Sequence, residues 1–223
     1  KSKAGSGTLT FAEGTNVKSI SVDFTKGTVT TRKAVQLWAG GPYFAEYNVG
    51  VTDGKAESYG GYYTWGGTYN NDHNLPDFSW NDYYNTGSSE LSHTGDDITD
   101  TATKLWGSKW RMPTQAELEA LINSTNCDVE WIDGTNKKYN NTTVKGLRCK
   151  GKGAYASNSV FLPAAGHCYN GFAYDQGDCG RYWSSTTTDG SRACRLYFYW
   201  GGQSVSDDFN RDYGYSVRAV LAK

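Results

Sequence analysis

The sequence lacks the features that mark several common classes of protein. Its formal net charge is −1, so it has no excess of basic residues of the kind that nucleic-acid binding usually needs. No apolar run approaches the ~20 residues that a membrane-spanning helix requires. The chain also contains no phosphate-binding loop, no GxSxG or HExxH motif and no GxGxxG fingerprint. These absences argue against a nucleic-acid binder, a membrane-spanning protein and the enzymes that such motifs mark.

Metal-binding patterns are missing as well. The three histidines, His73, His93 and His167, lie far apart in the sequence and lack the spacing of metal ligands. The five cysteines include no CxxC pair, which argues against a zinc site. We therefore expect no catalytic histidine, no bound metal and no cofactor.

One disulfide is geometrically reachable. Cys127 and Cys149 flank a predicted β-hairpin, and pairing Trp131 with Lys145 would place the two cysteines opposite each other. We predict this pair as the candidate disulfide.

Aromatic residues, in contrast, are abundant. They make up 15% of the 223 residues, with 17 Tyr and 8 Trp. This excess favours a β-rich protein with an aromatic surface. The length suits one large domain, or one domain with a small additional segment.

The N-terminal segment, 1–35, has the pattern of β-structure. Ile20, Val22 and Phe24 alternate with polar residues, as in a half-buried strand. This segment is either a hairpin that precedes the main domain or the end of a larger N-terminal domain. We assign 36–223 to the main domain.

A first, short helix is predicted near residue 100. Asp97 or Thr99 can cap its N-terminus, and Ala102, Leu105 and Trp106 share one face. These spacings predict a single amphipathic helix that packs by this face.

A second helix follows directly. Thr114 and Glu117 form a capping box after a proline, and Leu118, Leu121 and Ile122 give an apolar stripe. This is the strongest local signal for secondary structure in the chain, and it predicts that Glu117 caps the helix.

Strands are predicted at 127–132, 143–149 and 159–162, where the pattern returns to short β-segments separated by turns. The polar segment 66–95 shows little periodicity, and we predict a long loop there. The fold class that follows is α+β, with two helices and short antiparallel sheets.

The segment 195–199 alternates between two kinds of residue. If Leu196 and Phe198 point into a core, the side chains of Arg195, Tyr197 and Tyr199 point outward, because strand side chains alternate between faces. Tyr and Arg often carry binding energy at interfaces. The alternation therefore predicts an exposed surface suited to binding.

Six motifs occur in a fixed order along the chain. They are 44–50 (FAEYNVG), 59–66 (YGGYYTWG), 110–114 (WRMPT), 158–166 (NSVFLPAAG), 182–185 (YWSS) and 213–218 (YGYSVR). Together they resemble the Fibrobacter succinogenes major paralogous domain family, which is common in surface proteins of gut Bacteroidetes. The resemblance covers roughly 35–220.

This resemblance implies a C-type lectin-like fold and a likeness to the target proteins of diversity-generating retroelements. In those proteins, adenine-specific mutagenesis randomises Asn codons, which cannot become codons for Lys, Glu, Gln, Met or Trp. Between Gly153 and Ala222 the chain has no Lys, Glu or Met, which fits that rule. By the same rule, Gln176, Trp183, Trp200 and Gln203 belong to the framework or lie outside the randomised codons.

The resemblance also implies a variable ligand-binding region at about 164–215, whose variable side chains we expect to share one exposed face. The candidate ligand-contacting residues are Tyr169, Asn170, Phe172, Tyr174, Asp175, Asp178, Arg181, Arg192, Arg195, Tyr197, Tyr199, Asp207, Asp208, Phe209 and Tyr213.

The function implied is a non-catalytic binding module, an adhesin or receptor-binding domain, with a protein or glycan partner. The expected location is the bacterial cell surface, the medium or a phage particle. One alternative is an enzyme of the formylglycine-generating type on the same fold, which would need Cys179 and Cys194 as a reactive pair. Another is a pilus-tip or surface-assembly subunit.

Calcium is a further alternative, because many lectins of this fold bind sugar through it. The nearby carboxylates are those of Asp96, Asp97 and Asp100, and of Asp207 and Asp208. The first group is explained more simply by a helix N-terminus, and the second by a variable surface.

Overall fold

The computed structural model describes residues 21–25, 28–67, 100–187 and 192–222, with side chains from 32 onward apart from 207 and 208. Within these residues the strands form small antiparallel sheets, accompanied by two α-helices. The predicted α+β class is therefore confirmed. The predicted loop 66–95, His73, His93, Asp96 and Asp97 lie outside the described residues, apart from 66–67.

Five antiparallel β-units make up the described fold. β1 (Ser21–Thr25) and β2 (Thr28–Arg32) form a hairpin, and β9 (His167–Tyr169) and β10 (Phe172–Tyr174) form another. A four-stranded sheet has the order β3 (Ala34–Gln36), β4 (Tyr43–Ala45), β14 (Val220–Leu221), β5 (Trp110–Arg111). Two three-stranded sheets are β6 (Cys127–Ile132), β7 (Gly146–Gly151), β8 (Ser159–Pro163) and β11 (Cys179–Thr187), β12 (Arg192–Tyr199), β13 (Gly202–Asn210).

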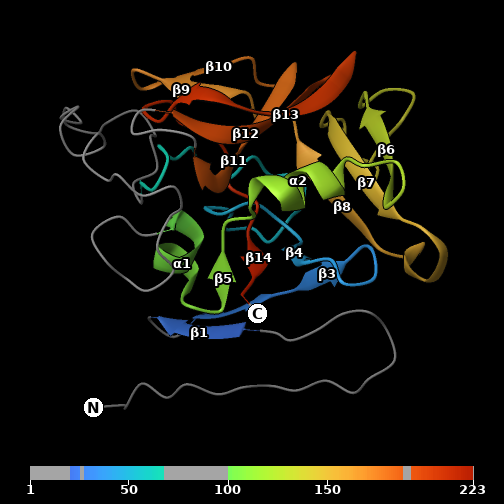
Figure 1. Cartoon of the computed structure of the whole chain (residues 1–223), viewed down its shortest axis with the longest axis horizontal. Coiled ribbons are helices and arrows are strands. Elements are labelled where there is room, and N and C mark those ends of the chain that lie inside the picture. Colours follow the sequence, from blue (N-terminus) through green and yellow to red (C-terminus); the bar gives the residue numbers. More distant parts are fainter. Residues whose placement is uncertain (1–20, 26–27, 68–99, 188–191, 223) are drawn as a thin grey trace.

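These units occupy different ends of the molecule (Figure 1). β9, β10 and the β11–β12–β13 sheet lie at one end, and β3, β5 and β14 at the other. β14, at the end of the described chain, lies between β4 and β5 and pairs with both. Segments from the beginning and the end of the main domain are thus held together by backbone hydrogen bonds.

The second helix, α2 (Gln115–Leu121), begins as the sequence predicts. Thr114 Oγ1 accepts a hydrogen bond from the Glu117 backbone N–H, and the Glu117 carboxylate accepts one from Thr114 N–H. Leu118 and Leu121 are buried. Both guanidinium Nη atoms of Arg111 also donate to this carboxylate, at 2.7 and 2.6 Å, so one acidic side chain joins the helix to β5.

The first helix, α1 (Thr101–Trp106), differs in detail from the prediction. Its N-cap is Asp100, whose carboxylate accepts hydrogen bonds from Thr103 N–H at 2.9 Å and Met112 N–H at 2.6 Å. Trp106 is buried, whereas Leu105 is 36% exposed. The prediction for Leu105 is wrong because the helix turns ~100° per residue, so its side chain faces away from the contact that Trp106 makes.

The predicted disulfide is also wrong. β6 has the predicted bounds, but Trp131 pairs with Leu147 instead of Lys145. This two-residue shift places Cys127 opposite Gly151 and Cys149 opposite Val129. Both cysteines are buried free thiols that lie diagonally on one face of the sheet. Diagonal partners are ~7–8 Å apart, beyond the reach of a disulfide.

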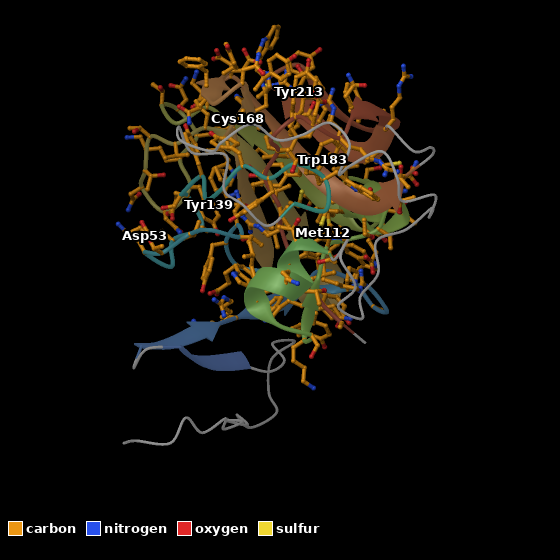
Figure 2. All side chains as sticks on the ribbon, turned by 90° about the vertical axis from the view of Figure 1, so that its left-hand side faces the viewer. Asp53, Met112, Tyr139, Cys168, Trp183 and Tyr213 are labelled. Atoms are coloured by element: carbon orange, nitrogen blue, oxygen red, sulfur yellow. The ribbon has the colours of Figure 1, made fainter. Side chains whose placement is uncertain are left out.

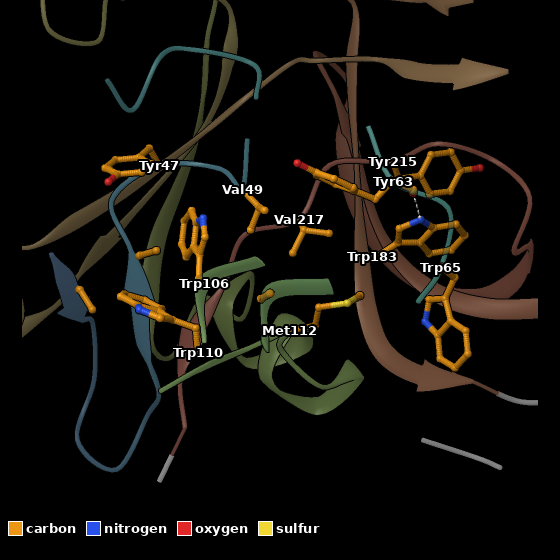
Figure 3. Packing of buried hydrophobic residues seen from close by; sticks show 14 of the residues in the cluster. Tyr47, Val49, Tyr63, Trp65, Trp106, Trp110, Met112, Trp183, Tyr215 and Val217 are labelled. Atoms are coloured by element: carbon orange, nitrogen blue, oxygen red, sulfur yellow. Dashed lines mark hydrogen bonds between the residues drawn. The ribbon is translucent and has the colours of Figure 1, made fainter. Parts of the chain in front are cut away.

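Two hydrophobic clusters hold the β11–β12–β13 sheet from opposite sides. Tyr182, Leu196 and Phe198 point into the cluster that also contains α2 and the β6–β7–β8 sheet. Trp183 points into the other cluster, where its Nε1 donates to Tyr63 O at 2.8 Å (Figure 3). The sheet is therefore fixed along much of its length. It is a rigid support for the side chains at its free end, which is the end where Tyr199 pairs with Cys179 and Gly202.

Neither described helix is long and apolar enough to cross a membrane.

Candidate functional site

The face of β12 opposite to Leu196 and Phe198 changes from buried to exposed along the strand. Ala193 is completely buried and Arg195 is 6% exposed. Tyr197 is half-buried, and Tyr199, at the end of the strand, is 38% exposed. The expectation that Arg195, Tyr197 and Tyr199 stand on one exposed face is therefore wrong for Arg195.

Arg195 is buried because a later segment of the chain covers its end of the sheet. Gly214 forms a bridge with Cys168, and Ser216 forms one with Tyr182. The chain between Phe209 and Ser216 therefore passes over β11 and β12. Figure 2 shows Tyr213 and Cys168 at the same end of the molecule, above Trp183.

Three aromatic rings surround the Arg195 guanidinium. Its Cζ lies 3.3 Å from the ring centre of Phe209, 4.8 Å from that of Tyr197 and 5.5 Å from that of Tyr215. Nε and Nη1 are buried and have no hydrogen-bond partner. Burial lowers the pKa of Arg195 to about 10, so the group stays charged at neutral pH. A buried, charged donor without an acceptor is an unusual and costly feature.

The β9–β10 hairpin stands beside this site and depends on two tight turns. Asn170 and Gly171 connect the strands with φ of 50° and 77°, the signs of a type I′ turn, for which Asn-Gly is the preferred pair. Gly166, just before β9, has φ of 69°, and a Cβ there would lie 1.9 Å from Tyr174 O. Asn170, predicted as a variable position, thus also has a conformational role.

His167, Asp175 and Arg181 form a polar cluster between the hairpin and β11. Arg181 Nη1 lies 3.0 Å from Asp175 Oδ2 and 2.5 Å from His167 Nδ1. A guanidinium can only donate, so Nδ1 is the acceptor and the neutral imidazole carries its proton on Nε2. Burial, followed by the positive charge of Arg181, lowers the pKa of His167. The histidine is therefore neutral at neutral pH.

The exposed large apolar side chains gather at the same end. In the described part of the chain these are Leu105, Phe172, Tyr174, Tyr199 and Trp200, and four of the five lie between 172 and 200. Phe172 is 63% exposed and Trp200 is 77% exposed. We call Phe172, Tyr174, Tyr199 and Trp200 the aromatic patch.

The patch is continuous with the polar cluster. Tyr199 pairs with Cys179 across the sheet, and Cys179 Sγ lies 3.9 Å from Asp175 Oδ2. Asp175 follows Tyr174 directly in the sequence. Beside them, the rings of Tyr169 and Tyr213 stack with centres 4.7 Å apart.

The structure distributes the predicted ligand-contacting residues over three degrees of exposure. Exposed are Asn170, Phe172, Tyr174, Asp175, Asp178, Arg192 and Tyr199; half-buried are Tyr169, Arg181, Tyr197, Phe209 and Tyr213; buried is Arg195. Asp207 and Asp208 belong to β13, but their side chains lie outside the described residues.

Two of these residues do not join the others. Arg192 is at the opposite end of β12 from Tyr199, where it pairs with Asn210. Asp178 faces Lys145, with 3.8 Å between Oδ1 and Nζ. Phe209 pairs with Ala193 near the same end as Arg192, and its ring reaches the site by stacking on Arg195. The other described residues lie around the hairpin and along β11 and β12 as far as Tyr199.

Sequence reasoning missed three residues of the site. His167 lies at its centre, Tyr215 forms part of its wall, and Trp200 is its most exposed aromatic residue. The position of Trp200 directly after the alternating tyrosines, next to Gly201 and Gly202, is a turn signal that could have identified it.

The two cysteines that an enzyme of the formylglycine-generating type would need are far apart. Cys179 and Cys194 lie toward opposite ends of the β11–β12 pair, so they cannot act as the reactive pair of a formylglycine-generating enzyme. Cys194 Sγ instead lies 3.1 Å from Gln115 Oε1 on α2. Across the described residues, no three His, Cys, Asp or Glu side chains are grouped as metal ligands would be.

Comparison with protein-family models, with curated proteins and with solved structures finds no match to this chain. Any statement about its function therefore depends on the residues of the site itself.

Proposed function

We propose that this chain is a non-catalytic binding module, whose aromatic patch and neighbouring β9–β10 hairpin contact a macromolecular partner. The observation that carries the proposal is the concentration of exposed aromatic side chains at one end of the molecule. Contiguous exposed apolar surface rimmed by polar groups marks interaction sites in soluble proteins. Tyr and Trp give a large contact area and lose little conformational entropy on binding.

The scaffold favours the same proposal. Hydrophobic clusters hold both faces of the β11–β12–β13 sheet, so the side chains at its free end start from a rigid support. Pre-organisation of this kind reduces the entropy that binding must overcome. We include in the proposal that the fold is C-type lectin-like and that the chain is a diversified surface, receptor-binding or adhesin protein of bacterial or phage origin.

Binding is tested with a matched pair of variants. The chain and a variant with Phe172, Tyr174, Tyr199 and Trp200 all changed to Ser are compared on arrays of bacterial and host surface proteins and glycans. We expect specific partners of the unaltered chain to bind the variant at least tenfold more weakly. Leu105→Ser, which removes an exposed apolar side chain elsewhere, should leave binding unchanged. Equal binding by all three proteins would contradict the proposal.

Diversification has a separate test. Sequencing the gene region for 164–215 in many sister isolates should find changes confined to Asn-derived codons at exposed positions, with Trp183, Leu196 and Phe198 constant. Changes scattered without that codon bias would contradict diversification. The proposed binding function would be unaffected, because the comparison of the serine variant with the unaltered chain tests it separately.

A further inference from the structure

Arg195 is a buried charge close to the aromatic patch. Arg181 has Asp175 as its carboxylate partner. Arg195 has no carboxylate partner among the described residues, and two of its buried nitrogens have no acceptor. Burial, together with the positive charge of Arg181, disfavours the charged form of Arg195. Within the described side chains, Arg195 Nε and Nη1 are therefore donors to which an anion from outside can bind.

The two guanidinium groups share one ring. The Cζ atoms of Arg181 and Arg195 lie 5.4 and 4.8 Å from the ring centre of Tyr197. Stacking against rings leaves the N–H groups of a guanidinium free, because they lie in its plane and point sideways. A carboxylate is the anion that best matches this planar pair of donors, through two parallel hydrogen bonds.

The surroundings indicate which kind of molecule carries the carboxylate. Phe209, which stacks on Arg195, and Tyr213, which contacts His167, are half-buried, and the side chains of the aromatic patch are exposed. Tyr, Trp, Phe and Arg are the residues enriched at the centres of protein–protein interfaces. An acidic side chain next to an apolar one complements this arrangement in both charge and shape.

We propose that Arg195 and Arg181 form a subsite for the carboxylate of an Asp or Glu side chain, presented by a protein partner beside an apolar residue. This inference rests on the proposed binding function and specifies its chemistry. Phe209 covers one face of the Arg195 guanidinium. Because Nε and Nη1 are themselves buried, docking requires the side chains around the edge of the guanidinium to move aside. The carboxylate then binds out of contact with water, where a charge-assisted hydrogen bond is strongest.

The test uses small probes on the whole chain. N-acetyl-Asp-Phe-amide, its Asn counterpart and glucuronate are titrated while the Arg195 Nε–H signal is followed by NMR spectroscopy. The backbone amide signals of Tyr197 and Phe209 are followed as well, and they report binding in the Arg195 variant. We expect the Asp probe to shift this signal saturably, and the Asn probe and glucuronate to bind at least fivefold more weakly. Arg195→Gln should weaken binding of the Asp probe at least tenfold. Arg148→Gln, which alters an arginine on a different sheet, should have no effect.

A second variant keeps the proposal testable if the first variant does not fold. If Arg195→Gln does not fold, Arg181→Gln, at a half-buried position, must still weaken binding of the Asp probe at least threefold. Stronger binding of glucuronate than of the Asp probe would overturn the proposal in favour of an acidic glycan. An Arg195 signal that no probe moves would also overturn it. If the serine variant of the aromatic patch still loses its partners in that case, the proposed function stands without this subsite.

Discussion

At the scale of single residues, Arg218 is a buried charge that four hydrogen bonds hold in place. Its Nε donates to Asn48 Oδ1, its Nη1 to the backbone oxygens of Ala45 and Glu46, and its Nη2 to Phe161 O, all within 3.0 Å. These contacts join the segment after β4 to β8 and to the C-terminal segment. Burial lowers the pKa of Arg218 to about 10, so the group remains charged at neutral pH.

Removal of this side chain should be severe. Arg218→Met leaves four acceptors buried without a donor, and we expect it to lower the free energy of unfolding by about 3–5 kcal/mol. Urea unfolding measures the loss. Arg148→Met, at a partly exposed ion pair with Glu130, should cost less than about 1 kcal/mol. Equal losses in the two variants would show that Arg218 is not a structural centre.

His167 gives a prediction for pH. Its pKa in the folded protein lies below the ordinary value of 6.5, because burial and Arg181 both disfavour the protonated ring. The unfolded chain therefore binds this proton at a higher pH than the folded chain does. The neutral His167 ring therefore contributes to the free energy of unfolding. This contribution is fully present above about pH 6.5, and it is lost as the pH falls through the pKa of His167 in the folded protein.

The titration can be followed directly by NMR spectroscopy of the His167 ring. Arg181→Met should raise its pKa, because the variant removes both a repelling charge and a hydrogen bond to the neutral ring. Arg148→Met should leave it unchanged. A His167 pKa that falls or stays constant in Arg181→Met would contradict the assigned contact.

At the scale of elements, the capping box of α2 is the clearest test. Thr114→Ala removes the hydroxyl that accepts the Glu117 N–H bond, and we expect a loss of about 1 kcal/mol in urea unfolding. Thr135→Ala, at an exposed loop position, should change stability by less than about 0.5 kcal/mol. The cap would be unimportant if both substitutions had the same effect.

The same elements show how far sequence patterns reach. The capping box and the apolar stripe predict α2 correctly because every interaction they involve is local. The alternation in β12 predicts correctly that Leu196 and Phe198 are buried. It fails for Arg195, because the segment that covers this side chain comes from 209–216, and no pattern within a strand reports which distant segment crosses it.

Register is the second limit of such patterns. Strands β6 and β7 are predicted close to their observed positions, yet the pairing differs by two residues, and that difference decides whether Cys127 and Cys149 meet. A shift of two keeps every side chain on its predicted face. The hydrophobic pattern is therefore equally satisfied by both registers, and only the turn between the strands distinguishes them.

At the scale of the whole molecule, β14 closes the fold. Val220 is completely buried and pairs with Phe44 in β4 and Arg111 in β5. Val220→Asp would bury a charge without a partner, and we expect it to cost at least about 3 kcal/mol, measured by thermal or urea unfolding. Val144→Asp, at a half-buried position outside the sheets, should cost much less. A cooperative transition unchanged in Val220→Asp would show that this closure is dispensable.

The position of β14 also determines how the molecule would carry a mechanical load. In Figure 1 this strand runs away from β9 and β10 toward the end of the chain. A pull between a partner held at the aromatic patch and an attachment beyond residue 222 would act along β14. The bonds that accept at Val217 O and Ala219 O, and the one that Ala222 N–H donates to Lys109 O, would then be loaded in shear. Bonds loaded in shear resist together, whereas bonds that are peeled yield one after another, so this geometry favours resistance to a pull in that direction.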